Sequence, residues 1–126
     1  MPEKIAVVVF VEHAQPADRG RMAHALHLAQ DLKHAGADFK LIFAGKAVEW
    51  LPELTHEDRA SQHPFVKAYG NVFDEVRDHV EACNFCCIRF KTHDAVQGAD
   101  ISIRGEGKDH MKLGALVMDG YRLVTI

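Results

Sequence analysis

Short apolar runs alternate with longer amphipathic stretches along the chain, which is the arrangement of strands and helices in an α/β protein. Residues 5–11 are apolar on both alternating sets of positions, as a parallel strand covered by helices on both faces must be. We therefore expect this segment to form the middle strand of a sheet. The other predicted strands cover residues 39–44, 80–82, 101–103 and 122–126.

Helical spacing of apolar residues is clearest at residues 21–34, where Met22, Leu26 and Ala29 share one face and Gly36 follows as a stop. The other predicted helices cover residues 48–51, residues 65–76 with a possible break at Gly70 and Asn71, residues 85–88 after Asn84 as a cap, and residues 111–118 with Asp109 as a cap and Gly120 as a stop. Five strands and about five helices in alternation predict a βαβ architecture.

The composition is that of one globular domain spanning residues 1–126, with 48% hydrophobic and 26% charged residues and a formal net charge of -3. Because both signs of charge are mixed along the chain, we expect no nucleic-acid or membrane partner. The apolar run at residues 5–11 is too short to span a membrane and has no small-residue cleavage site. The sequence therefore predicts a cytoplasmic protein.

The loops that follow parallel strands gather at one edge of a sheet and form the ligand crevice of such folds. Most of the chemically useful side chains of this chain follow a predicted strand. They are Glu12 and His13 after the first strand, Lys46 after the second, Cys83 after the third, and Arg104, Asp109 and His110 after the fourth. The sequence therefore predicts a polar crevice that contains a thiol.

The three cysteines of the chain are Cys83, Cys86 and Cys87. Their C-x-x-C-C spacing is too tight to join distant parts of a fold, and three thiols cannot all pair, which favours reduced cysteines. A helix that begins after Asn84 would place Cys83 just before its positive end and Cys86 in its first turn. Such a position favours the thiolate and lowers the pKa of a cysteine.

A thiolate at this place would attack electrophilic sulfur, and a second cysteine three residues away could resolve a resulting disulfide or accept the sulfur. Arg89 and His110 could add positive potential around the thiols. Cys87 is better explained as a small buried side chain that points inward together with Ile88.

Metal binding is an alternative interpretation of these cysteines and of the histidines. Zinc could bind Cys83 and Cys86 with His93 or His110, but a second C-x-x-C or a close H-x-x-x-H is missing, and an iron–sulfur centre usually has four thiolates. Four polar side chains share a helical stripe opposite an apolar face, where a solvated surface is the simpler interpretation. These are His24, His27, Asp31 and His34. Residues 105–107 are only a fragment of a dinucleotide-binding fingerprint, so we interpret them as a turn.

The chain resembles the DsrE/DsrF-like proteins of intracellular sulfur metabolism over nearly its whole length. The resemblance rests on the order and spacing of several segments: the opening strand, ALHLAQDLKHAGA at residues 25–37, FAGKAVEWL at residues 43–51, ACNFC at residues 82–86, and DGYRLVTI at residues 119–126. It implies a three-layer α/β/α sandwich on a five-stranded parallel sheet, of DsrEFH-like and flavodoxin-like architecture, assembled into trimers or hexamers.

In sulfur-transferring members of that family, a cysteine at the end of the third strand carries a persulfide, and Cys83 matches it by position. The resemblance also matches Cys86 to a second cysteine of one branch, Arg89 to a basic residue of the following helix, and His110 to a histidine at the start of the last helix. Two positions depart from the pattern. Cys87 stands where a small residue is usual, and Lys91 stands where a glycine is common.

The main hypothesis is a sulfur carrier or sulfurtransferase-like protein without a cofactor. In it, Cys83 accepts sulfane sulfur from a donor persulfide and passes it to Cys86 or to a partner protein, so that Cys83→Ser abolishes sulfur loading. One alternative is an oligomeric module that binds a small anion or a metal in the same crevice. The other is a dithiol oxidoreductase that uses Cys83 and Cys86.

Overall fold

The structure is a computed structural model that describes residues 3–12, 16–59 and 62–126, without the side chain of Pro16. Five strands are present: β1 (Lys4–Val9), β2 (Asp38–Phe43), β3 (Val80–Cys83), β4 (Ser102–Arg104) and β5 (Arg122–Thr125). The helices are α1 (Pro16–His34), α2 (Trp50–Leu54), α3 (Pro64–Val76), α4 (Asn84–Arg89), α5 (His93–Gly98) and α6 (Leu113–Met118). Two 3-10 segments, η1 (Gly45–Glu49) and η3 (Arg77–His79), precede α2 and β3.

The five strands form one parallel sheet in the order β4-β3-β2-β1-β5. The predicted α/β/α architecture with a five-stranded parallel sheet is therefore confirmed. The strand order differs from the 2-1-3-4-5 order of flavodoxin itself, so the likeness to that fold is one of layers. The first strand was expected in the middle of the sheet. It lies between β2 and β5 instead, and β2 is central.

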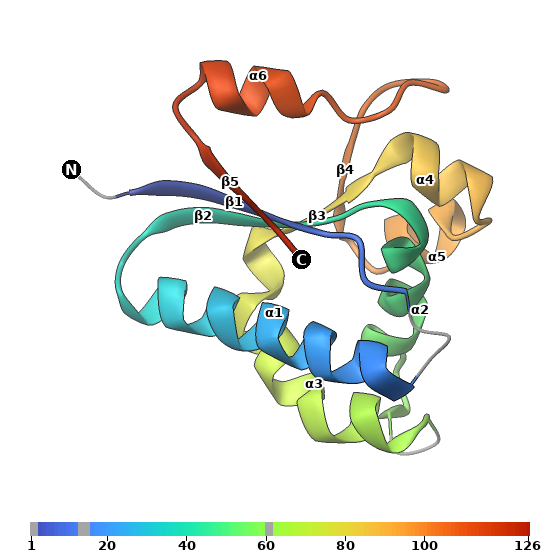
Figure 1. Cartoon of the computed structure of the whole chain (residues 1–126). Coiled ribbons are helices and arrows are strands. Elements are labelled where there is room, and N and C mark those ends of the chain that lie inside the picture. Colours follow the sequence, from blue (N-terminus) through green and yellow to red (C-terminus); the bar gives the residue numbers. More distant parts are fainter. Residues whose placement is uncertain (1–2, 13–15, 60–61) are drawn as a thin grey trace.

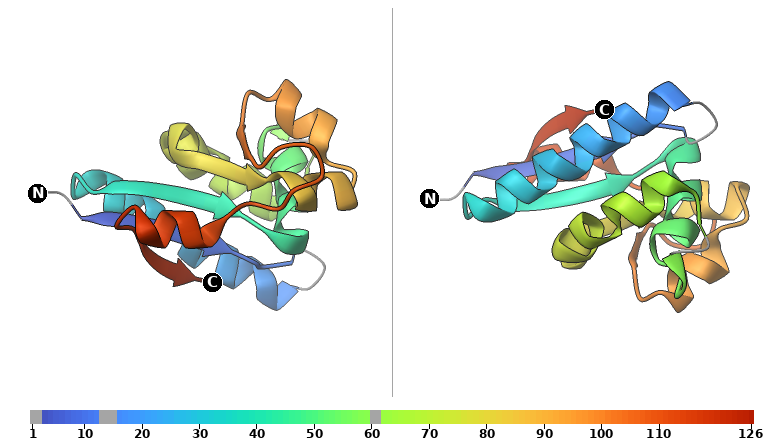
Figure 2. Two further views of the ribbon diagram at one scale, coloured as in Figure 1. Left: turned by 90° about the horizontal axis from the view of Figure 1, so that it is seen from above. Right: turned by 90° about the horizontal axis from the view of Figure 1, so that it is seen from below.

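The strand order explains how the helices are distributed over the two faces. From β1 to β4 the chain moves in one direction across the sheet, and right-handed crossovers then place the connecting helices on one face. The return from β4 to β5 runs the other way and places α6 on the opposite face. Figure 1 shows α1 and α3 side by side below the sheet and α6 above it. Figure 2 shows the same arrangement from above and below.

Each face of the sheet has its own buried cluster, because successive residues of a strand point to opposite faces. On β1, Val7 and Val9 belong to the cluster under α1 and α3, whereas Ala6 and Val8 belong to the cluster under α6. Both clusters include side chains with no exposed surface. The apolar pattern of residues 6–9 therefore reflects burial on both faces, as expected, whereas Phe10 lies beyond the end of β1 and is 46% exposed.

The helices differ from their predicted bounds in several places. Helix α1 begins at Pro16, before the predicted Arg21, since proline is well suited to a first helical position. The possible break in α3 does not occur, and Gly70 instead lets the Arg59 side chain pass, because a Cβ there would lie 2.6 Å from Arg59 Cδ. Asp109 does not cap α6, which follows Lys112. Helix α5 was not predicted.

No helix in the described part of the chain is long and apolar enough to cross a membrane.

Candidate functional site

The three thiols lie where β3 passes into α4. Cys83 is the last residue of β3 and also the N-cap of α4, with an extended backbone at φ -69° and ψ 123°. This confirms the predicted strand and puts Cys86 in the first helical turn. Asn84, the expected cap, is instead the first residue of the helix. The three thiols are therefore grouped at the carboxyl end of an interior strand, at the edge where parallel sheets bind ligands.

The thiols point in different directions from this short segment. Cys83 is 1% exposed and belongs to the buried cluster under α6. Cys87 is fully buried and belongs to the opposite cluster, under α1 and α3. Cys86 packs against both clusters and is only half-buried. Of the three, Cys86 is therefore the thiol that solvent and a reactant can reach.

A polar contact and a neighbouring thiol define the surroundings of Cys86. The backbone N–H of Gly45 donates a hydrogen bond to its Sγ across 3.1 Å, from the turn that follows β2. Gly45 has a φ of +58°, a conformation that glycine adopts without strain. Cys83 is the N-cap of the helix that has Cys86 in its first turn, and Cys86 packs against the buried cluster that contains Cys83. Cys83 and Cys86 therefore form an adjacent thiol pair, with one member buried and the other accessible.

Burial raises the pKa of Cys86 to about 11, and the neighbouring Cys83 thiol acts in the same direction. The Gly45 N–H opposes this rise because it stabilises the thiolate. The direction is opposite to the lowering expected at a helix start. Helix α4 has only six residues, so its dipole is small, and desolvation is the larger effect.

Cys87 has a different environment on the other side of α4. Burial raises its pKa, and the Thr92 hydroxyl acts in the opposite direction. Cys87 has no exposed surface, so a reactant in solution cannot reach its thiol. This agrees with the interpretation of Cys87 as a packing residue, whereas Ile88, which was expected to point inward with it, is 44% exposed.

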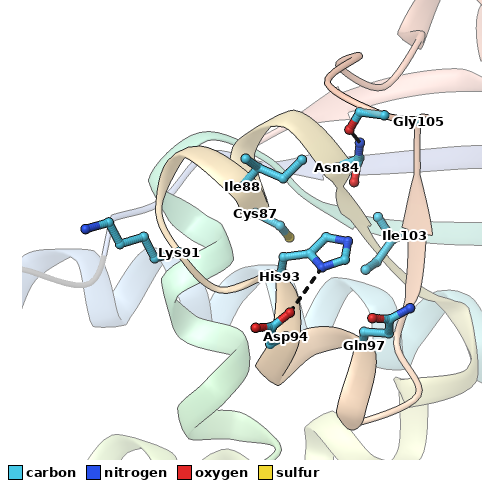
Figure 3. A pocket seen from close by; sticks show the side chains of 10 residues that line it. Asn84, Cys87, Ile88, Lys91, His93, Asp94, Gln97, Ile103 and Gly105 are labelled. Atoms are coloured by element: carbon cyan, nitrogen blue, oxygen red, sulfur yellow. Dashed lines mark hydrogen bonds and ion pairs between the residues drawn. The ribbon is translucent and has the colours of Figure 1, made fainter.

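A cavity of about 680 Å³ lies beside Cys87, between α4, α5 and the loop after β4. In Figure 3 the Cys87 sulfur and the His93 ring point toward one another across this space, and the Lys91 side chain extends away from both. Lys91 has a φ of +58°, which explains why a glycine is common at this position of the resembling family. The residues that line this cavity do not include Gly45, Cys83 or Cys86, so it is separate from the Cys83–Cys86 pair.

The loop after β4 is attached to α4 by Asn84. Its side-chain amide donates to the carbonyl oxygen of Gly107 at 2.7 Å. Gly105 has a φ of +108°, and a Cβ at this position would lie 2.7 Å from the carbonyl oxygen of Asp109 and 3.1 Å from Asn84 Cβ. Glycine is therefore required where this loop passes the helix, in agreement with its interpretation as a turn.

Arg89 and His110, predicted as site residues, are both exposed. The Arg89 guanidinium lies 5.9 Å from the centre of the Phe90 ring. Within residues 3–12, 16–59 and 62–126, no hydrogen bond or ion pair joins either side chain to a thiol. No such contact among the described residues therefore supports the predicted role of Arg89 and His110 beside the thiols.

Arg104 is the basic residue that the sheet places beside Cys83. The two residues are partners in the register of β3 and β4, so their side chains leave the same face. The Arg104 Nε donates to a carboxylate oxygen of Glu81 at 2.7 Å. The sequence contained the signal, since both residues end a predicted strand, but only the strand order makes them neighbours.

The remaining predicted crevice residues are more scattered. Lys46 lies in η1, 4.0 Å from the carboxylate of Glu49, and Glu12 is exposed after β1. His13 lies outside the described residues. The four side chains of the helical stripe are all exposed, as expected: His24, His27, Asp31 and His34. Within the part of the chain that the structure describes, no group of three or more His, Cys, Asp or Glu side chains could hold a metal ion.

Comparisons with known proteins give relatives without an assigned function. No protein-family model matches the chain. It is 27% identical over 124 residues to the uncharacterized protein MJ0733 of Methanocaldococcus jannaschii, covering 98% of this chain and 95% of that protein. Its fold is similar to that of the conserved protein of unknown function BT1422 from Bacteroides thetaiotaomicron, with a TM-score of 0.62 and 16% identity over 98% of this chain and 95% of that one. The structural likeness shows a shared α/β fold.

Proposed function

We propose that this chain is a sulfur-handling protein of the DsrE/DsrF-like type, which takes up sulfane sulfur as a cysteine persulfide at the Cys83–Cys86 pair. The observation that carries the proposal is the pair of adjacent thiols at the end of β3, of which Cys86 is accessible and Cys83 is buried. The resemblance of residues 82–86 to the persulfide-carrying segment of that family supports the same assignment.

The burial of the two thiols supports Cys86 as the residue that reacts first. A donor persulfide cannot approach Cys83, which is 1% exposed, without displacing the residues around it, whereas Cys86 is half-buried. The Cys86 thiolate attacks the outer sulfur of the donor persulfide, the sulfur–sulfur bond of the donor breaks, and the donor leaves as a thiolate. The Gly45 N–H stabilises the attacking thiolate. The high pKa of Cys86 makes this reaction faster at alkaline pH.

Intact-protein mass spectrometry after exposure to inorganic polysulfide tests the proposal. We expect the wild type to react at the Cys83–Cys86 pair, and Cys83→Ser to gain a reducible sulfur atom. Cys86→Ser should gain none, and Cys87→Ser is the matched control that should react as the wild type does. Sulfur on Cys87 alone, or no reaction of the wild type and Cys83→Ser, would reject the assignment.

A dithiol oxidoreductase is the second candidate, and the adjacency of Cys83 and Cys86 at the start of α4 favours it. Such a protein would reduce substrate disulfides and become oxidised to a Cys83–Cys86 disulfide. Reduction of insulin with a recycling dithiol reductant measures this activity. Turnover of insulin by a protein that takes up no sulfur from polysulfide would favour the oxidoreductase over the carrier.

A further inference from the structure

The Cys83–Cys86 pair also suggests what happens to the sulfur after it has been taken up, an inference that rests on the proposed function. A persulfide on Cys86 has an inner sulfur, which is the Cys86 Sγ itself, and an outer sulfur that came from the donor. The thiol that the fold places beside this inner sulfur is Cys83, because it is the N-cap of the helix that has Cys86 in its first turn and belongs to the buried cluster against which Cys86 packs. An external thiol must approach from solvent and lacks that position.

We propose that the chain releases the sulfur as hydrogen sulfide by an internal reaction of its two cysteines. The Cys83 thiolate attacks the inner sulfur of the Cys86 persulfide, a Cys83–Cys86 disulfide forms, and the bond to the outer sulfur breaks. The outer sulfur leaves with the bonding electron pair as hydrosulfide, which takes up a proton from water. The sulfane sulfur is reduced, the two cysteines are oxidised, and a dithiol reductant must restore them before the next cycle.

The choice between the two sulfur atoms is decided by the leaving group. Attack on the outer sulfur would pass the sulfur to Cys83 and expel the Cys86 thiolate, whose pKa is about 11 in this site. Attack on the inner sulfur expels hydrosulfide, which is much less basic, and a less basic sulfur leaves faster. Reduction of the outer sulfur is thereby favoured over its transfer.

Two features of the geometry support the same outcome. The Gly45 N–H points at the Cys86 Sγ, so it withdraws charge from the atom that is attacked. Cys83 lies within the buried cluster under α6, which keeps other thiols away from it. Sulfur passed to Cys83 would therefore be difficult for a partner protein to collect, whereas sulfide is small enough to leave.

A single-turnover experiment with glutathione persulfide tests the inference. The reduced protein is mixed with the persulfide, and the sulfide formed is trapped with monobromobimane while the protein is analysed by intact mass spectrometry. For the wild type we expect about one sulfide per chain, no retained sulfur and the loss of two free thiols. Cys83→Ser and Cys83→Ala should retain sulfur on Cys86, and their sulfide should fall to the level of the donor alone. Cys87→Ser should match the wild type.

The outcomes separate this inference from the proposed function. Wild-type protein that retains sulfur and releases no sulfide would overturn the internal reaction and leave a sulfur carrier. Sulfide release by both Cys83 variants at the wild-type level would also overturn it. If neither the wild type nor the Cys83 variants take up sulfur or release sulfide, both proposals fail. Circular dichroism shows whether the two Cys83 variants are folded. Cys83→Ala is included because a serine hydroxyl is poorly accommodated in a buried site, whereas alanine is small and apolar.

Discussion

The two faces of the sheet differ in how much of the chain covers them. The face under α1 and α3 has a large buried cluster with the aromatic residues Phe43, Trp50 and Phe73. The face under α6 has a much smaller cluster, in which Met111 and Tyr121 are the largest side chains. The thick layer supplies most of the apolar burial that stabilises the fold. The half-buried Cys86, just after the end of β3, lies where the two layers meet.

The largest effect should come from removing an aromatic side chain of the thick layer. Phe73 is fully buried and lies edge-on to Phe43 at a centroid distance of 6.4 Å. We expect Phe73→Ala to lower the free energy of unfolding by about 3–5 kcal/mol, and Leu116→Ala in the thin layer by about 2 kcal/mol. Urea denaturation followed by circular dichroism measures both.

The exposed Val117 of the same short helix provides the control. Val117→Ala should change the free energy of unfolding by less than about 0.5 kcal/mol. If Leu116→Ala destabilised the protein more than Phe73→Ala does, the thin layer would have to be the main source of stability, and the comparison of the two faces would be wrong.

A smaller effect should separate two cysteines that are adjacent in the sequence. Cys87 is fully buried in the thick layer, so Cys87→Ser should cost about 1–2 kcal/mol, because a hydroxyl replaces a thiol in an apolar site. Cys86→Ser should cost less than about 0.5 kcal/mol, since the site is half-buried and the Gly45 N–H can donate to the new oxygen. Chemical denaturation under reducing conditions compares them, and equal costs would contradict the assignment of Cys87 to packing.

The sequence predicts the secondary structure around this site better than the contacts of its side chains. The strand before Cys83 and the position of Cys86 in a first helical turn follow from local patterns, and both are confirmed. The Gly45 N–H could not be predicted as a partner of Cys86, because it is a backbone group 41 positions away that becomes a neighbour only through the order of β2 and β3. Helix α5 was missed because it is six residues long and has one buried apolar side chain, Val96.

Electrostatic expectations depend even more on the fold. The position of Cys86 near a helix start predicts a lowered pKa. The pKa is raised instead, because burial between two clusters destabilises the thiolate more than a short helix stabilises it. The basic residue in register with Cys83 is Arg104 on β4, which lies 15 positions beyond Arg89, the residue that the sequence singled out. The charged neighbours of a site can therefore be predicted only when the strand order is known.

The smallest predicted effect is a pH dependence on the outer surface of the thick layer. Arg59 binds Asp74 with two hydrogen bonds, of 2.7 and 2.6 Å, and these bonds, ahead of the charge attraction, hold the pKa of Asp74 below its usual value. A carboxylate with a lowered pKa stabilises the folded state above its unfolded pKa, near pH 4, and this stability is lost as the pH falls through the folded pKa. The side chains are 21% and 47% exposed, so solvent screens the pair to less than about 1 kcal/mol.

Asp74→Asn removes the charge and keeps the shape of the side chain, which makes it the variant to compare with the wild type. We expect the wild type to be the more stable protein at pH 6, and the difference in the free energy of unfolding to disappear as the pH falls below about 3. Added salt should reduce the difference at pH 6, because the pair is at the surface. Urea denaturation across this pH range provides the measurement. A difference that stays constant with pH would mean that Asp74 acts through packing around Arg59, and the thick layer would then owe its stability there to shape and not to charge.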